Sequence, residues 1–430
     1  MRDKILQILA EEIVPAEGCT EPIALAYAAS LVTKIYDGCL ADSMQIFLSG
    51  NMIKNVKSVH IPNSDGQVGI EYAVAMGAIL GNSNRKLMVI ADIDRSRLCE
   101  VQQYVDRGVI SISLQKDAPK LYIRIEADGK AGHAVVEISD FHTNVTRLEL
   151  NGKSLMEFGD GCSDKAIDVS ESYTDRSFLT IDMICSVAST IDLALIEPIF
   201  NKVVEYNSAI AREGLEHEYG IAIGKTIYEG MKEGVYGNDL KNNLSCFAAA
   251  GSDARMNGCP LPVMTTSGSG NQGMTCSLPV IRFCQFKGLD RETMIRGLFV
   301  SHMTTVHIKE VIGRLSAYCG AMAASAGVSG ALCYMDGLGT DKVKMAVQTT
   351  LATVSGIICD GAKSSCATKI ATGVSSAVDA YFAAKKGRGF NYGEGIVGAD
   401  IEKTIDHVGT LGCDGMSTTD DVILDIMLKG

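Results

Sequence analysis

The feature that most constrains this 430-residue chain is a change in hydrophobic pattern near residue 175. Before that point, short apolar runs with a two-residue period, typical of β-strands, alternate with helical stretches. After it, the strand pattern nearly disappears, and apolar residues follow the spacing of long helices separated by glycine-rich turns. The sequence therefore predicts an α+β fold, with a smaller α/β domain inserted after N-terminal helices and a larger helical domain.

The first part of this plan covers residues 1–42 and 43–160. Two helices separated by a turn around Gly18 are expected at the N-terminus, because Pro15 and Pro22 prevent one continuous helix. The α/β domain, 43–160, is expected to contain five strands and two helices, at 44–48, 86–90, 109–114, 121–127 and 133–138 and at 71–81 and 95–107. We expect 1–42 to be a helical segment that packs on the helical domain.

Residues 161–430 are expected to form the all-helical domain. Its helical patterns include 179–212, 217–233, 290–312, 315–335, 341–358 and 368–386. Many of these segments are rich in Ala, Ser and Gly, as in 320–331, and small side chains allow helix backbones to approach closely. We therefore expect such helices at the centre of a bundle.

The composition disfavours several functional classes. The 39 basic and 51 acidic residues give a net charge of −12, which argues against binding to nucleic acid or to an anionic membrane. The chain has no uncharged apolar run of about 18 residues and no signal-peptide pattern, so we expect a cytoplasmic protein without a membrane span. In that compartment its 14 cysteines are more often core thiols, metal ligands or catalytic groups than disulfides.

The first candidate site is the string Gly268-Ser-Gly-Asn-Gln-Gly273, which has the G-x-G-x-x-G spacing. A dinucleotide site requires that spacing between a strand and a helix of a βαβ unit, but here it lies in the helical half of the chain. Its backbone N–H groups and short polar side chains suit a carboxylate or another small anion. From the residues alone, a flexible loop without a ligand is an equally good interpretation.

The second candidate is the set Cys319, Cys359 and Cys366. The last two are seven residues apart, which on a continuous helix would separate them by ~10.5 Å along its axis. Gly361 offers a place where the backbone can bend, so we predict a loop or a helix break there. The spacing alone favours buried structural thiols over metal ligands.

The third candidate is Cys19, which lies between Glu17 and Glu21 at a predicted helix start. Thr20 is expected to cap that helix, with Pro22 in its first turn. A helix N-terminus lowers the pKa of a thiol, whereas neighbouring carboxylates raise it. A packed cysteine without a chemical role is the alternative.

Five strings taken together resemble the L-cysteine desulfidases, a group also labelled UPF0597 or serine dehydratase alpha-chain-like. They are Glu17-Gly-Cys-Thr-Glu-Pro22, Gly50-Asn-Met-Ile-Lys-Asn55, Ser267-Gly-Ser-Gly-Asn-Gln-Gly273, Gly313-Arg-Leu-Ser-Ala-Tyr-Cys319 and Cys359-Asp-Gly-Ala-Lys-Ser-Ser-Cys366. The resemblance covers nearly the whole chain, and the ordered set is far more specific than any single string. It is more distant to the iron–sulfur L-serine dehydratases, which share the helical catalytic domain.

This resemblance implies an iron-dependent lyase. It implies a 4Fe–4S cluster held by Cys319, Cys359 and Cys366, with one iron left open for a small β-substituted L-amino acid such as L-cysteine. The implied products are pyruvate, ammonia and sulfide, and Cys19 matches the active-site cysteine expected to act as base or proton shuttle. The implied substrate-binding residues, which include weaker contacts from the α/β domain, are Ser267, Gly268, Ser269, Gly270, Asn271, Gln272, Asn51 and Lys54.

Several alternatives stay open at this point. The same cluster could dehydrate L-serine, it could serve a redox or sensory protein without turnover, or the cysteines could pack a core without any cluster. We expect a small amino-acid substrate and no nucleic-acid or membrane partner, and a homo-oligomer is compatible with the sequence. The physiological substrate, the oligomeric state and the identity of the base do not follow from the sequence.

Overall fold

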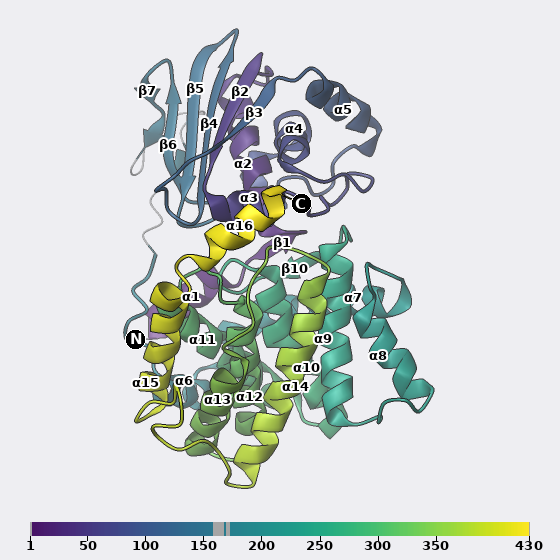
Figure 1. Cartoon of the computed structure of the whole chain (residues 1–430), viewed down its shortest axis with the longest axis vertical. Helices are drawn as coiled ribbons and strands as arrows, with labels where there is room; N and C mark the ends of the chain where they lie inside the picture. The colour runs from purple at the N-terminus through teal and green to yellow at the C-terminus, as the bar shows by residue number, and fades with distance from the viewer. Residues whose placement is uncertain (1, 158–166, 169–172, 430) are drawn as a thin grey trace.

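The computed structural model describes residues 2–157, 167–168 and 173–429, and it has the expected α+β architecture. Figure 1 shows a unit with a mixed sheet above a larger helical unit. Each unit has a hydrophobic core of its own. The predicted domain boundary at residue 160 lies outside the described residues.

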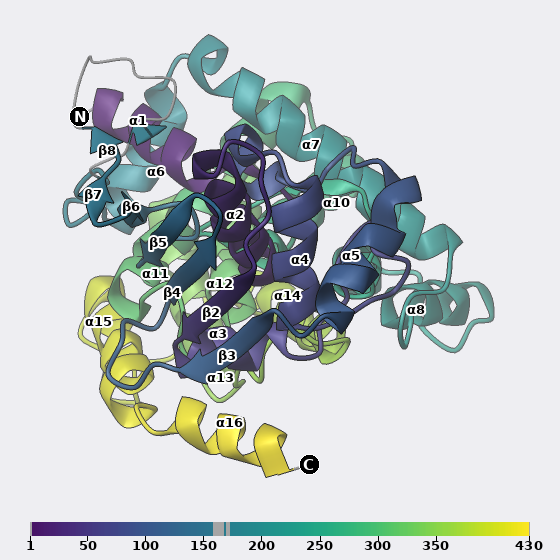
Figure 2. The ribbon, with the colours of Figure 1, turned by 90° about the horizontal axis from the view of Figure 1, so that it is seen from above.

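The α/β unit combines a six-stranded sheet with helices: β2 Ser43–Leu48, β3 Ile110–Leu114, β4 Tyr122–Gly129, β5 Gly132–Ser139, β6 Val145–Leu150, β7 Lys153–Ser154, α2 Thr20–Ile35, α3 Gly50–Val56, α4 Ile70–Leu80 and α5 Leu98–Asp106. The strand order is β3-β2-β4-β5-β6-β7, with β2 and β3 parallel and the other neighbours antiparallel. The helices α2, α4 and α5 lie on one side of the sheet (Figures 1 and 2), where α2 packs on β4 and β5.

Several details of the α/β unit differ from the prediction, which contained neither α3 nor β7. The run 86–90 is not a strand, because Ser83–Met88 forms a 3₁₀ segment (η1) that packs against α2, with Lys86 at a φ of 48°. Its apolar residues are buried without a neighbouring strand, and a short apolar run does not distinguish these cases. Strand β6 was not predicted, since Thr146 and Arg147 are adjacent exposed residues that interrupt its alternation.

The shorter elements of the chain complete its description. A second 3₁₀ segment, η2 Arg95–Arg97, precedes α5, and β8 Met156–Glu157 pairs in parallel with β9 Ile167–Asp168. Near the C-terminus, η3 Leu411–Gly415 is a π-helical turn.

The helical unit contains α1 Arg2–Glu12, α6 Ile181–Thr190, α7 Leu193–Glu216, α8 Ile223–Lys232, α9 Leu240–Met256, α10 Gly270–Lys287, α11 Arg291–Ile312, α12 Gly320–Met335, α13 Thr340–Val354, α14 Ser365–Lys385, α15 Ile401–Thr410 and α16 Thr419–Lys429. The predicted helix 179–212 is two helices, because Asp192 caps α7 and accepts a hydrogen bond from the Ala194 N–H. The predicted helices 315–335 and 341–358 are each shorter, because α12 begins at Gly320 and α13 ends at Val354. Four of the residues that precede α12 line a pocket described below: Leu315, Ser316, Tyr318 and Cys319.

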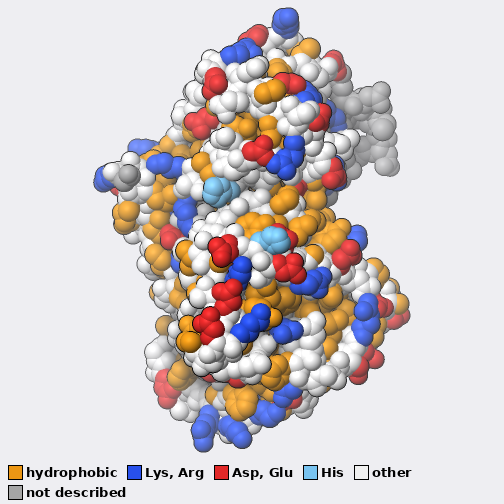
Figure 3. Space-filling view, turned by 90° about the vertical axis from the view of Figure 1, so that its right-hand side faces the viewer, with side chains coloured by type: hydrophobic (Ala, Val, Ile, Leu, Met, Phe, Trp, Pro, Cys, Tyr) orange, Lys and Arg blue, Asp and Glu red, His pale blue; other side chains and the backbone are white. Residues whose placement is uncertain are grey.

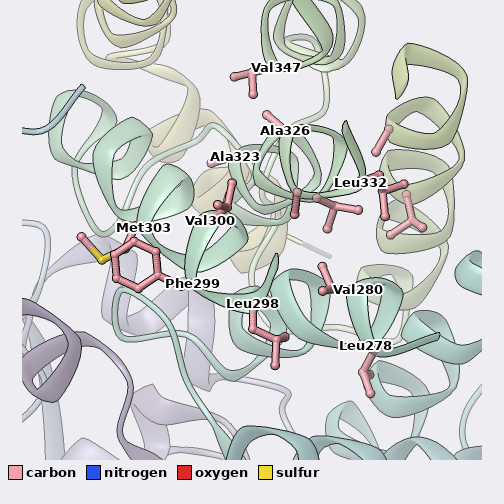
Figure 4. Close-up of a cluster of buried hydrophobic side chains, with 14 of the residues drawn as sticks. Leu278, Val280, Leu298, Phe299, Val300, Met303, Ala323, Ala326, Leu332 and Val347 are labelled. Atoms are coloured by element: carbon pink, nitrogen blue, oxygen red, sulfur yellow. The ribbon is translucent and has the colours of Figure 1, made fainter. Parts of the chain in front are cut away.

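The small-residue helix α12 lies at the centre of the bundle, as expected. It packs against α10, α11, α13 and α14, and Figure 4 shows Ala323, Ala326 and Leu332 among side chains of the neighbouring helices. A Cβ added at Gly327 would stand 2.4 Å from the Ser301 carbonyl oxygen. Only glycine therefore permits this approach of α12 to α11.

The two units are joined at both ends of the chain. Near the N-terminus, β1 Pro15–Glu17 pairs antiparallel with β10 Pro262–Met264. The predicted segment 1–42 divides between the cores, because α1 packs in the helical unit and α2 in the α/β unit. Near the C-terminus, α16 returns to the α/β unit and packs on α3 (Figure 1).

The surface shows no single dominant charge on the face in Figure 3, where acidic and basic side chains are interspersed. Within the described ranges, no individual helix has both the length and the apolarity needed to cross a membrane. The pair α6 and α7, bent by 106° at the break between them, meets that criterion only when the two are taken together.

Candidate active site

A pocket lies between the two units and is lined by residues of both. Of the residues predicted from the sequence, those that line it are Cys19, Asn51, Lys54, Ser269, Asn271, Gln272, Cys319, Cys359 and Cys366. Ser267 lines a neighbouring pocket, which shares Lys309 and Arg314 with the first. Gly268 and Gly270 line neither of these two pockets.

Cys319 and Cys359 are brought together by a short antiparallel bridge. The bridge pairs Tyr318 with Ile358, the Cys319 N–H donates to the Ile357 carbonyl (3.1 Å), and the Cys359 N–H donates to the Ala317 carbonyl (2.7 Å). Two segments 40 residues apart in the sequence are thereby held side by side. The two cysteines consequently lie diagonally across the bridge.

Cys366 reaches the same place because the helix is interrupted, as predicted, around Gly361. α13 ends at Val354 and α14 begins at Ser365, so Cys359 and Cys366 do not share a helix. Gly361 has a φ of +96°, and a Cβ there would be 2.7 Å from the Lys54 carbonyl oxygen. Both the backbone conformation and the close approach of α3 require glycine at this position.

The thiols of Cys319, Cys359 and Cys366 interact electrostatically. Burial raises the pKa of Cys319 to about 12, and the other two sulfurs contribute to the increase. Burial likewise raises the pKa of Cys366 to about 11, with a contribution from Cys359. Among the described residues, no three His, Cys, Asp or Glu side chains are arranged to ligate a single ion. A cubane cluster is a different case, because each thiolate binds its own iron and the sulfurs can stand further apart.

Cys19 lies at the N-terminus of α2, where it is the N-cap residue in place of the predicted Thr20. The preceding Gly18 has a φ of +62°, and a Cβ there would stand 2.7 Å from two atoms of the Pro62 ring. The ladder between β1 and β10 then places this turn beside the loop that follows Met264. Burial raises the pKa of Cys19 well above its ordinary value, and the Glu21 carboxylate raises it further.

Glu21 holds the Cys19 thiol in a buried polar network. Cys19 Sγ and Thr20 Oγ1 donate to Glu21 Oε2 at 3.3 and 3.1 Å, and Asn55 Nδ2 donates to Oε1 at 3.1 Å. His142 Nε2 lies 3.9 Å from the same Oε1. Burial raises the pKa of Glu21, but His142 and the hydrogen-bond donors outweigh it and bring the value to about 2. Glu21 is therefore an ionised acceptor for the Cys19 thiol.

The glycine-rich string is a tight turn followed by the first turn of α10. Contrary to our expectation of a loop over all of 267–273, α10 begins at Gly270, and Ser269 caps it by accepting from the Gln272 N–H (3.4 Å). A Cβ at Gly273 would lie 2.0 Å from the Met264 carbonyl oxygen. The strand before the turn, β10, pairs only with β1 and antiparallel, so the βαβ context of a dinucleotide site is absent from the described structure here.

Asn51 and Lys54 project from α3 to the pocket, but their polar ends already have partners. Lys54 Nζ donates to Asp420 Oδ1 (2.5 Å) and to the Cys359 carbonyl (3.1 Å). Asn51 Nδ2 donates to Asp420 Oδ2 at 3.0 Å. The C-terminal helix α16 thus supplies the carboxylate that holds both side chains and, through Lys54, supports the Cys359 segment.

The electrostatic environment of the pocket is positive. The N-termini of α2, α10, α12 and α14 all meet there, and each carries a partial positive charge. Lys309 on α11 lies between the two pockets, where burial lowers its pKa to about 8 against the opposing effect of Cys359 and Cys319. Arg255 and Arg314 also line the pocket between the two units. Such surroundings favour bound thiolates and carboxylates.

Sequence reasoning missed several of these residues as site components. Glu21 belongs to the same string as Cys19, so the sequence could have indicated its carboxylate as a neighbour of the thiol. Arg255, Lys309, His142 and Asp420 had no motif around them, and only the tertiary fold brings them to the site.

Comparisons with known proteins agree with this architecture. The family model described as serine dehydratase alpha chain matches residues 21–425. A UPF0597 protein of Fusobacterium nucleatum is 51% identical over 99% of both chains. UPF0597 proteins of Desulfitobacterium hafniense and Lachnoclostridium phytofermentans are 42% and 41% identical, and the alignments cover 99% and 100% of this chain and 96% and 100% of theirs.

Proposed function

Because the chain belongs to the serine dehydratase alpha chain family, we propose that it is an iron–sulfur-dependent lyase that converts L-cysteine to pyruvate, ammonia and hydrogen sulfide. The observation that carries this proposal is the convergence of Cys19, Cys319, Cys359 and Cys366 on one pocket. The family itself supports lyase chemistry, and the four cysteines support the choice of substrate and cofactor. We place the reaction in the reducing cytoplasm, where thiols stay available as ligands.

The donor set fits a 4Fe–4S cluster held by Cys319, Cys359 and Cys366. Thiolates are the usual ligands of such clusters, and these sulfurs lie close together, because Cys359 and Cys366 raise the pKa of Cys319 and Cys359 raises that of Cys366. Lys309 supplies a buried positive charge beside them. When bound, a cluster with three protein ligands supplies one iron with an open position, which acts as a Lewis acid toward the substrate.

The start of α10 is suited to orient the substrate. Ser269, Asn271 and Gln272 line the pocket at a helix N-terminus, where free backbone N–H groups and the helix dipole favour an anion. The substrate carboxylate is the anion we assign to this end. Its β-sulfur is then directed toward the three cysteines, which line the same pocket.

Cys19 is the residue we assign to proton transfer at Cα. Its raised pKa keeps the thiol protonated at neutral pH, with the proton donated to Glu21 Oε2. Cys19 Sγ can therefore accept the Cα proton only as its own proton moves to Glu21, which Thr20 and Asn55 hold in place. The proton removed from Cα and the departing β-SH group of the substrate together form hydrogen sulfide. The remaining 2-aminoacrylate tautomerises to an imine, which one water hydrolyses to pyruvate and ammonia.

L-Serine is the second candidate substrate, because the matching family model is that of the serine dehydratase alpha chain. Its elimination uses the same proton transfer and releases water in place of sulfide. A redox protein without turnover is a third candidate, and it would show reversible reduction of the cluster without product formation.

The experiment is an anaerobic preparation assayed for iron, acid-labile sulfide and turnover. We expect about four irons per chain and the release of sulfide and pyruvate from L-cysteine, with slower pyruvate formation from L-serine. Exposure to air is expected to remove both iron and activity, since an open iron is readily lost. An iron-free protein that stays inactive after reconstitution, or an iron-loaded one that forms no pyruvate, would contradict the proposal.

A further inference from the structure

One buried cation of the pocket, Arg255 on α9, has donors that nothing in the described structure uses. Its side chain is 2% exposed and lines the pocket. Nη1 donates to Asn271 Oδ1 at 3.1 Å, but Nε and Nη2 have no hydrogen-bond partner among the described residues. A guanidinium is always charged, and a buried charge without a counter-ion is strongly unfavourable.

The two unused nitrogens belong to one edge of the guanidinium. Nε–H and one N–H of Nη2 point in parallel, which is the arrangement that binds both oxygens of a carboxylate. Resting on the proposed function, we infer that this edge of Arg255 binds the α-carboxylate of the substrate.

The residues around Arg255 keep this edge open. A Cβ at Gly270 would stand 2.4 Å from Arg255 Nε, so glycine leaves the space next to the unused donors. Ser252 Oγ also donates to Asn271 Oδ1 (3.3 Å), which fixes the amide that holds Nη1. The positive charge of Arg255 acts on Cys19 and opposes the increase in its pKa. Arg255 and Cys19 line the same pocket, so a carboxylate bound to Arg255 shares that pocket with the residue assigned to proton transfer at Cα.

Two unused acceptors in the same pocket suit the other charged group of an amino acid. Asn55 Oδ1 and Gln272 Oε1 are buried and have no hydrogen-bond partner within the described ranges. Asn55 Nδ2 donates to Glu21, which can only accept, so Oδ1 is correctly assigned as the free acceptor. The donor edge of Arg255 matches the carboxylate of an amino-acid zwitterion, and the two free amide oxygens match its ammonium group. The substrate class is thus a free α-amino acid rather than its amide or ester.

The test compares L-alanine with L-alaninamide, which differ at the carboxylate and have no β-leaving group. Calorimetric titration of the anaerobic holoprotein is expected to show L-alanine binding on the order of 100-fold more tightly. Arg255→Gln should abolish this preference. Arg255→Lys should retain only part of it, since lysine cannot donate two parallel bonds. Arg282→Lys, on α10 but outside this pocket, is the matched control and should bind as the unchanged protein does.

Turnover gives a second, independent result. With iron content unchanged, Arg255→Gln should raise KM for L-cysteine on the order of 100-fold, and Arg255→Lys should raise it by a smaller factor. The inference is overturned if Arg255→Gln keeps the preference, or if the unchanged protein binds both probes equally or neither of them. Failure of the proposed function would look different: the unchanged protein would release no sulfide, whereas the ratio of probe affinities would still report on Arg255.

Discussion

The centre of the helical bundle and the pocket at its end both bury cysteines and polar groups, but the two regions differ in the surroundings of these groups. In the bundle centre, Cys276 Sγ donates to Thr305 Oγ1 (3.1 Å), and His302 Nδ1 lies 2.7 Å from Thr266 Oγ1. In the pocket, Arg255 and Gln272 keep polar atoms without partners among the described residues. The bundle centre also leaves His302 Nε2 and Thr304 Oγ1 without partners among the described residues, so what distinguishes the pocket is that its unpartnered atoms line a cavity and include those of a charged guanidinium.

This difference teaches that thiol burial does not identify a ligand. Burial raises the pKa of Cys276 to about 12, and it raises that of Cys319 to about 12 as well. What distinguishes Cys319 is its neighbours, because Cys359 and Cys366 add to its pKa and Lys309 lies close by. Convergence of several thiols, rather than the state of one, marks the candidate ligands.

The largest expected effect comes from removing one candidate ligand. Cys319→Ser, Cys359→Ser or Cys366→Ser should reduce the iron content to background and abolish sulfide release, since two thiolates cannot retain the cluster. Cys276→Ser, in the bundle centre, is the matched control and should keep its iron. Iron and acid-labile sulfide are measured on anaerobic preparations. Equal iron content in these three variants and in the Cys276 control would contradict the distinction between candidate ligands and core thiols.

The next effect separates cluster binding from proton transfer within the pocket. Cys19→Ala should retain the iron and colour of the unchanged protein, while kcat for L-cysteine falls by about 10²- to 10⁴-fold because the proton acceptor is missing. Glu21→Gln should lower kcat by a smaller factor with unchanged iron. Cys246→Ala, a buried thiol on α9 that donates to the Asn243 carbonyl, serves as the control. Normal turnover by Cys19→Ala would show that another group takes the proton.

How far the sequence predicts the structure can be seen in particular elements. The composition of α12 placed it correctly at the bundle centre, because small residues leave only one favourable packing distance. The run 86–90 was wrongly predicted as a strand, since its four apolar residues carry too little periodicity to exclude an irregular segment. The helix 179–212 was wrongly continued through Asp192, whose side chain caps the second helix.

In the candidate site, too, local sequence strings were predictive, whereas contacts between distant segments were not foreseen. Its cysteines lie in recognisable strings, so the sequence alone is enough to select them. Their assembly depends on the Tyr318–Ile358 bridge and on the ladder between β1 and β10, which are contacts between distant segments. Arg255 could not be selected, because it is distinguished by two nitrogens that have no hydrogen-bond partner among the described residues, and only three-dimensional contacts reveal that.

A smaller effect is expected from breaking the ion pair between the pocket and the C-terminal helix α16. Lys54 is 1% exposed and pairs with Asp420. Lys54→Met should leave that carboxylate buried without its cation and lower the free energy of unfolding by about 3 kcal/mol. Lys429→Met removes a cation from an exposed pair on the same helix, with Asp425, and should change stability by less than about 0.5 kcal/mol. Urea unfolding measures both, and similar values for the two variants would contradict the structural role of the buried pair.

The smallest effect concerns two buried carboxylates, Asp253 in the bundle and Glu21 in the pocket. Asp253 Oδ2 accepts from the Gly224 N–H (2.8 Å), but burial dominates and raises its pKa to about 7. The unfolded chain has a value near ~3.9, so the folded state binds this proton more tightly. The contribution of Asp253 to stability is therefore complete below pH ~4 and is lost as pH rises to about 7. Glu21, with a pKa of about 2, has the opposite sign, and its contribution is lost only as pH falls below ~4.

Between pH 5 and pH 8 only the first of these two carboxylates changes its contribution. Asp253→Asn should therefore reduce the decrease in unfolding free energy over that interval by about 1–2 kcal/mol, as measured by urea unfolding at each pH. Glu17, whose burial raises its pKa to about 7, should maintain part of the decrease in the same variant. Glu21→Gln should leave the pH dependence over this interval unchanged, because Glu21 is ionised throughout. An unchanged pH dependence in Asp253→Asn would mean that the bundle accommodates the Asp253 charge as readily as the pocket accommodates that of Glu21.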